Sequence, residues 1–243
     1  MNREIHQWHS PRLDKNMEVA VYGHHGFALL MFPTAAADYL EYERFHVIAA
    51  LAPFIDSGQV KVFSINSINS ESWLNREMHP RHKAVRHGQF NDYVTAEVVP
   101  FIHTHCHGPL PIITAGASFG ALHAANHLFR RPDLFDGCIA MSGSYDLKDY
   151  TDGYWDQDVY FNSPLDYLPG LDDDTQPTLL RAKPHLHFIS GQGAYEKPSS
   201  SVDIGRVLGR KGIPHEIDLW GYDVDHDWPW WRKMLPHCLG TKF

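Results

Sequence analysis

The chain has 243 residues, of which 43% are hydrophobic and 21% charged, and its formal net charge is -8 at pH 7. This length is sufficient for one large domain with a substantial core. The acidic balance and the lack of a basic run argue against a nucleic-acid partner, which would require a basic stripe. The apolar runs are also too short to cross a bilayer, so we expect no membrane association.

Short apolar runs alternate with helical patterns along the chain, which is typical of a mostly parallel sheet with crossover helices. The runs predict strands at residues 17–22, 27–32, 60–65, 111–115, 138–142, 185–190 and 215–220. The helical patterns predict helices at 43–55, 90–102, 119–129, 201–208 and 228–235, the second of them broken late by Pro100. The runs FALLMF and LPIITA suit strands buried on both faces. An α/β fold is therefore expected.

Residues 145–180 interrupt this alternation. The segment is rich in Asp, Tyr, Pro and Gly, includes Asp172, Asp173 and Asp174, and has no clear period. We interpret it as one long excursion from the sheet that helps to shape the substrate cleft. No repeat or linker divides the chain, so residues 1–243 are expected to form a single domain.

The cysteines and the N-terminal residues indicate the cellular compartment of the protein. Cys106, Cys138 and Cys238 are odd in number and far apart, which is no disulfide framework and fits a reducing compartment. The segment MNREIHQWHSPRLDKN is polar and lacks the apolar core of a signal peptide. We therefore expect a cytoplasmic protein.

A candidate nucleophile lies between the predicted strand PIITA and the Ala-rich helix ALHAANHLF. There Gly116-Ala117-Ser118-Phe119-Gly120 matches G-x-S-x-G, the motif of a sharp turn that presents a serine hydroxyl at the carboxyl end of a strand. The two glycines suit this turn because a Cβ would approach the neighbouring backbone too closely. The alternative is a plain Gly-rich turn in which the serine caps the helix.

The serine needs a base to take its proton. In this arrangement the base follows the last strand, and His226 lies in the loop after HEIDLW, between Asp225 and Asp227. His237 is a second candidate but lies beyond the following helix.

An acid should orient the base from the loop after the preceding strand. Glu196 is the first carboxylate after HLHFIS, Asp203 is the next, and Asp146 is a third candidate. Such a carboxylate would accept a hydrogen bond from the imidazole and hold it in one tautomer.

Two backbone N–H groups must stabilise the oxyanion that forms during acyl transfer. The first is expected from Phe119, and the second from Thr34 or Ala35 in the loop FPTAAA. Aromatic residues near these loops could line a pocket for the acyl or alcohol group, or could simply pack in the core: Tyr39, Trp73, Tyr145, Trp155, Tyr195 and Trp228.

The 18 histidines raise the question of a metal site. Many, including His87, stand in polar contexts typical of a surface. His103, His105 and His107 alternate, so they could present ligands on one face of a strand. No HExxH or CxxC motif accompanies them, and they lie where a helix should pass into a strand. We therefore expect a structural or surface role and no metal site.

The chain resembles the serine-esterase branch of the α/β-hydrolases, which includes esterase D (S-formylglutathione hydrolase), enterochelin esterases and mycolyltransferases. The matching segments are FPTAAADYLEYE, SINSESW, GASFG, SGQGAYE and VDHDWPWW, and they cover nearly the whole chain. The resemblance implies an α/β-hydrolase fold and a serine hydrolase of esters or thioesters without a metal or organic cofactor. Many relatives have Asp where this chain has Glu196, which leaves the identity of the acid open. The lack of a secretion signal disfavours the extracellular cell-wall activities of the branch.

These observations together predict a carboxylesterase that acts on a small-molecule ester through a Ser-His-Glu triad. A thioesterase or an acyltransferase could use the same residues. A non-catalytic binding protein is a further alternative, although it would have no need of a serine, an acid and a histidine in this order. A metal-binding protein that uses the histidines is another, and a homo-oligomer is compatible with all of these.

Overall fold

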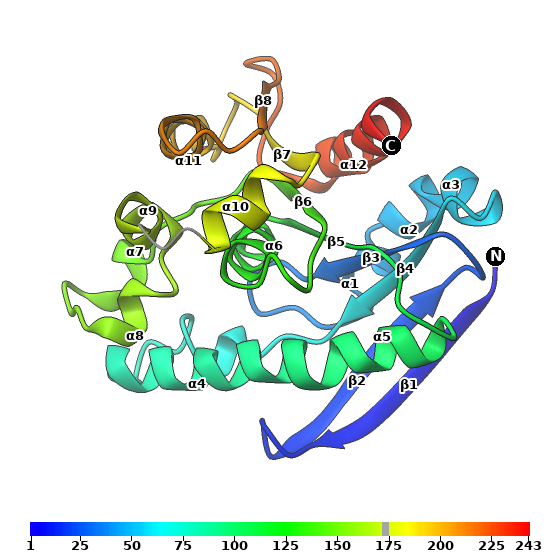
Figure 1. The fold of residues 1–243 in the computed structure, drawn as a ribbon, viewed down its shortest axis with the longest axis horizontal. Coiled ribbons are helices and arrows are strands. Elements are labelled where there is room, and N and C mark those ends of the chain that lie inside the picture. Colours follow the sequence, from blue (N-terminus) through cyan, green and yellow to red (C-terminus); the bar gives the residue numbers. More distant parts are fainter. Residues whose placement is uncertain (172–174) are drawn as a thin grey trace.

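A single mixed sheet organises the computed structural model, which describes residues 1–171 and 175–243 (Figure 1). The run from Asp172 to Asp174 lies outside the described residues. The sheet has the strand order β1-β2-β4-β3-β5-β6-β7-β8. Its strands are β1 (Arg3–Ser10), β2 (Lys15–Tyr22), β3 (Phe27–Phe32), β4 (Val60–Ile65), β5 (Ile112–Ala117), β6 (Gly137–Met141), β7 (His185–Ser190) and β8 (Glu216–Leu219).

The sheet is antiparallel at one edge and parallel elsewhere. Strand β2 pairs antiparallel with both β1 and β4, whereas every neighbouring pair from β4 to β8 is parallel. Strands β4, β5 and β6 are buried along their whole length, which explains their continuous apolar runs. This strand order and the crossover helices are those of the α/β-hydrolase fold, as predicted.

Helices cover both faces of the sheet. One face packs against α4 (Pro80–Tyr93), α5 (Val99–His105), α6 (Phe119–Arg130) and α11 (Pro198–Arg210). The other packs against α1 (Glu41–Arg44), α2 (Val47–Ala50), α3 (Ala52–Asp56) and α12 (Trp228–Lys242). Two apolar cores, one on each side, thus hold the strands whose carboxyl ends carry the functional loops. No helix among the described residues is both long enough and apolar enough to span a bilayer.

Two helix predictions were wrong in detail. The helix expected at 43–55 is three short helices, because His46 adopts a left-handed conformation with φ of 62° and a new helix starts at Ala52, with Pro53 in its first turn. The helix expected at 90–102 starts ten residues earlier at Pro80 and reaches His105. Pro100 does not break it. A π-helical segment, η2 (Val94–Val98), directly precedes α5, and this irregular turn lets the continuous helical stretch accommodate Pro100.

Strand β1 was not predicted. Its sequence, REIHQWHS, is polar, and the strand is mostly exposed at the sheet edge, where it forms a hairpin with β2. The segment 145–180 was expected to be irregular but contains the short helices α7 (Lys148–Thr151), α8 (Gln157–Tyr160), α9 (Pro164–Tyr167) and α10 (Thr175–Arg181), with the 3₁₀ turn η3 (Leu168–Gly170).

Three histidines are buried in the core between α4 and α6. His87, His123 and His127 are each at most 3% exposed, and their rings stack among Phe32 and Phe90. The surface context predicted for His87 was therefore wrong. Burial lowers the pKa of His123 to about 3 and that of His127 to about 4, and it holds the pKa of His87 well below the ordinary value. All three rings are neutral at pH 7.

Candidate active site

Ser118 stands in the turn between β5 and α6. Its φ of 55° and ψ of -120° are unusual for a residue with a side chain, and such strain persists only where the surrounding structure imposes it. A Cβ on Gly116 would lie 2.3 Å from the carbonyl carbon of Gly120, and one on Gly120 would lie 2.3 Å from the carbonyl oxygen of Phe32. Both glycines are therefore required for the tight packing of this turn.

A buried tyrosine, which the sequence analysis did not single out, braces the same turn. The Tyr42 hydroxyl donates to the carbonyl of Phe32 at 2.7 Å and accepts from the N–H of Ala117 at 3.0 Å. It thereby joins the carboxyl end of β3 to that of β5, next to Ser118.

His226 lies in the loop between β8 and α12, and its Nε2 is 2.9 Å from the Ser118 Oγ. Its side chain is 24% exposed, and the Trp231 ring packs against it edge-on at 5.1 Å. The flanking aspartates support the loop and not the ring. Asp225 accepts from the N–H of Ala194 at 2.7 Å, and Asp227 caps α12.

Glu196 faces the other side of the imidazole, with its Oε2 3.5 Å from Nδ1 of His226. This distance is at the long end for a hydrogen bond, as is common in unliganded sites. The Glu196 side chain is fully buried. Burial opposes ionisation of this carboxyl, but hydrogen bonds from His226 and Ser142 outweigh burial, and its pKa lies below the ordinary value. The carboxylate is therefore charged at neutral pH.

Ser142, at the end of β6, is a supporting residue that the sequence analysis missed. Its hydroxyl donates to Oε1 of Glu196 at 2.5 Å and accepts from Nε1 of Trp231 at 3.0 Å. Its φ of 52° is left-handed, which is uncommon for serine. A single hydroxyl thus links the acid to the ring that packs on His226.

The loop after β3 packs against the serine turn, since a Cβ on Gly120 would lie 2.3 Å from the carbonyl oxygen of Phe32 and 2.8 Å from that of Pro33. The Thr34 N–H donates to Oε2 of Glu41 at 2.8 Å, and the Thr34 hydroxyl donates to Oε1 at 2.7 Å. This N–H is therefore occupied, and the prediction of Thr34 as an oxyanion donor was wrong. Among the described residues, the N–H groups of Ala35 and Phe119 have no acceptor and are free for a ligand.

Two consecutive hydrogen bonds connect the backbone at Ala35 to the buried core. Ala35 has φ of 30°, and its carbonyl accepts from Nδ2 of Asn69 at 2.5 Å. Oδ1 of Asn69 in turn lies 2.8 Å from Nε2 of the buried His123, which donates because an amide oxygen only accepts. Asn69 in the 3₁₀ turn η1 (Asn69–Glu71) therefore orients the peptide next to the free N–H.

Comparison with known proteins places the chain in a family. Residues 19–241 match the Esterase family, described as "Putative esterase". The chain belongs to this family. It is an enzyme that cleaves ester bonds, as the resemblance predicted.

Solved structures agree with this esterase in fold. A ferulic acid esterase superposes with a TM-score of 0.75 at 18% identity, over 98% of this chain and 95% of that one. An S-formylglutathione hydrolase from Staphylococcus aureus gives 0.72 at 17% identity, over 98% and 95%. MPT51 from Mycobacterium tuberculosis gives 0.66 at 15% identity, over 99% and 97%. No curated protein matches the chain.

The other acid and base candidates of this esterase lie away from Ser118. Asp203 is 49% exposed and pairs with Arg206 at 2.8 Å, and Asp146 accepts from the backbone N–H of Lys148 at 3.1 Å. His237 is exposed on α12. None of them contacts the imidazole of His226.

A cavity of about 210 Å³ opens above Ser118. Its lining residues are Ser118, Phe119, Leu122, Ser142, Gly143, Ser144, Asp149, Tyr150, Tyr195, Lys197 and His226. Asp149 and Tyr150 come from the excursion at 145–180, which therefore forms part of the cleft. The sequence analysis did not select Tyr150, because nothing in its local pattern distinguishes it from a packing residue.

Of the six aromatic residues proposed to bind substrate, only Tyr195, which is 91% exposed, lines this cavity. The other five do not: Tyr39, Trp73, Tyr145, Trp155 and Trp228. Tyr145 is fully buried against Phe188, and Trp228 stacks on Phe45. Trp73 is buried as well but borders an adjacent cavity of about 400 Å³, which shares Asp149 and Tyr150 with the first.

Proposed function

We propose that this esterase hydrolyses small carboxylic esters through a covalent acyl-enzyme, with Ser118 as nucleophile, His226 as general base and Glu196 as the acid. The observation that carries the proposal is the 2.9 Å separation between Ser118 Oγ and His226 Nε2 in a strained turn at the end of β5. This distance is within the range needed for proton transfer from the hydroxyl to the imidazole.

In the first half-reaction, Ser118 Oγ attacks the ester carbonyl carbon while its proton passes to Nε2 of His226. The tetrahedral oxyanion accepts hydrogen bonds from the N–H groups of Phe119 and Ala35. The bond to the alcohol oxygen then breaks, and His226 returns the proton to the leaving alkoxide. Water attacks the acyl-serine by the same route in reverse, releasing the carboxylic acid and restoring Ser118.

Glu196 serves the base in this scheme. Its buried, ionised carboxylate accepts the Nδ1–H of His226, which leaves Nε2 free to take the serine proton and stabilises the imidazolium that follows. Ser142 holds the carboxylate from the other side.

The size and lining of the cleft favour a small substrate. The cavity of about 210 Å³ has Phe119, Leu122 and Tyr150 as its apolar lining, and the exposed pair Lys197 and Asp149 at 3.6 Å lies at its rim. We therefore propose a short acyl group and a polar leaving group, with no nucleic-acid or membrane partner. The expected cytoplasmic location stays a prediction from the sequence.

The test is covalent labelling of the folded protein with a fluorophosphonate, followed by mass spectrometry of its peptides. The adduct should be on Ser118 and absent in Ser118→Ala. Ser144→Ala is the matched control, since this serine lines the same cavity and should not alter labelling. Labelling at another residue, or no labelling of folded protein, would refute the assignment. A panel of nitrophenyl esters and acyl thioesters of increasing chain length then measures the preferred bond and acyl length.

A further inference from the structure

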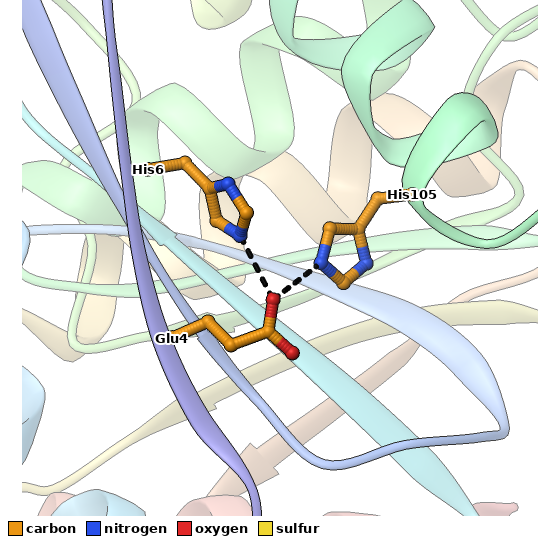
Figure 2. A group of neighbouring side chains, drawn as sticks. All are labelled: Glu4, His6 and His105. Carbon is orange, nitrogen blue, oxygen red and sulfur yellow. Dashed lines mark hydrogen bonds and ion pairs between the residues drawn. The ribbon is translucent and has the colours of Figure 1, made fainter.

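A group of side chains that can bind a metal ion lies where β1 passes the end of α5, away from Ser118. Glu4 and His6 alternate on β1 and therefore face the same side of the strand. His105 is the last residue of α5. Figure 2 shows the two imidazoles converging on one carboxylate oxygen, although Glu4 and His105 are separated by 101 positions in sequence.

The ligand atoms of these residues are already close together. Oε2 of Glu4 lies 3.0 Å from Nε2 of His6 and 3.1 Å from Nε2 of His105, and one ligand atom from each of the three residues lies within 4.8 Å of the others. Around a tetrahedral zinc ion with bonds of the usual length, ligand atoms are about 3.3 Å apart. Two of the three separations are near that value, and modest rotation of the side chains would bring in the third.

We propose that Glu4, His6 and His105 form a binding site for a divalent transition-metal ion of the zinc type. Two imidazoles and one carboxylate are ligands that zinc, nickel and copper accept and that magnesium and calcium do not favour. The Glu4 side chain is 47% exposed, so water can reach a fourth coordination position.

The site differs from the one that the sequence analysis considered and dismissed. Only His105 of the alternating histidines takes part. His103 lies two residues earlier on α5, and His107 follows the helix with a left-handed φ of 59°. The alternation of His103, His105 and His107 therefore does not form the proposed metal site, because two of its three ligands come from β1.

The position of the site indicates its effect. Strand β1 is the edge strand, and its ladder partner is β2 alone. Near the far end of β1, Trp8 and Ser10 both donate to the carboxylate of Glu97 in η2 at 2.8 Å. A metal ion at Glu4 would tie the opposite end of β1 to α5. Strands β2, β4 and β3 separate this point from β5 and Ser118, so the ion would stabilise the fold without entering catalysis.

The surroundings of His105 limit the affinity. Its Nδ1 is buried and has no hydrogen-bond partner among the described residues. Metal-bound imidazoles usually donate this N–H to a carboxylate or carbonyl, and loss of such a partner typically costs about 10- to 100-fold in affinity. We therefore expect reversible binding that a strong chelator removes.

The experiment is a zinc titration of the untagged protein in competition with a chromophoric chelator, together with thermal unfolding. The wild type should bind one zinc ion, and zinc at about 100 times its Kd should raise Tm by roughly 5–10 °C. Glu4→Gln and His105→Ala should each weaken this binding at least tenfold and, at the same zinc concentration, reduce the rise of Tm to about half or less. The matched control is His103→Ala, which lies on the same helix outside the group and should bind like the wild type.

Three results would overturn the proposal: no zinc binding by the wild type, equal binding by His105→Ala, or an equal rise of Tm with magnesium. Glu4→Gln remains informative if His105→Ala fails to fold, because the Glu4 side chain is about half exposed and the substitution by glutamine should leave the fold intact. Ester hydrolysis by the wild type should persist after EDTA, which separates this site from the proposed catalytic residues.

Discussion

The three buried histidines should make the protein acid-labile well above the pH at which carboxylates titrate. In the unfolded chain, His87, His123 and His127 should each have a pKa near about 6.5. In the folded protein, burial lowers these pKa values, to about 3 for His123 and about 4 for His127. The unfolded state therefore binds more protons below pH 6.5. The contribution of the neutral rings to stability is fully present above about pH 6.5 and is lost as pH falls toward about 4.

The size of the effect follows from proton linkage. At pH 5.5, protonation of one unfolded histidine lowers the free energy of unfolding by about 1.4 kcal/mol relative to neutral pH. Three such rings lower it by about 4 kcal/mol, which is a large part of the roughly 5–15 kcal/mol that stabilises a typical domain. Few carboxylates titrate at this pH, so the histidines should dominate the change.

The assay is urea unfolding at pH 7.5 and pH 5.5 of the wild type and two variants. His87→Leu is the informative variant, because His87 Nδ1 has no partner and leucine has a similar volume. Its loss of stability between the two pH values should be smaller than that of the wild type by about 1.4 kcal/mol. His82→Leu is the control, since His82 is exposed on the same helix and should leave the difference unchanged. Equal differences in wild type and His87→Leu would refute the reasoning.

Three further predictions concern the active site. Glu196→Gln should keep the fold and lower kcat by several orders of magnitude (roughly 10⁴ in another serine-hydrolase triad), whereas Asp203→Asn should leave kcat near the wild-type value. The opposite result in ester kinetics would show that Asp203, and not Glu196, is the acid of the triad. Asn69→Ala should release the peptide at Ala35 and lower kcat by about 10- to 100-fold with little change in KM; a change in KM alone would contradict a role in positioning. Gly120→Ala should lower the free energy of unfolding by about 1–3 kcal/mol, because its Cβ would clash with backbone; an unchanged urea midpoint would contradict this packing.

Local patterns in the sequence predicted most of the strands and the serine turn, because neighbouring residues determine how a strand is buried and which turn it can enter. The runs FALLMF and PIITA predicted β3 and β5, since a strand with helices on both faces must be apolar at every position. The flanking glycines of Ser118 predicted a sharp turn, and a Cβ on either of them would indeed lie only 2.3 Å from neighbouring backbone atoms. Strand β1 was not predicted, because an exposed edge strand does not need a continuous apolar run.

Contacts between distant loops could be decided only by the tertiary structure. Local sequence offered Glu196, Asp203 and Asp146 as acids, and only the packing of the loop after β7 places one of them within 3.5 Å of the imidazole. Local sequence likewise did not predict that Glu41 accepts a hydrogen bond from the Thr34 N–H or that Tyr145 is buried. Nor did it predict that three histidines are buried between α4 and α6. The cluster at Glu4 combines residues about a hundred positions apart. Such juxtapositions depend on strand order and helix packing, which no short stretch of the chain encodes.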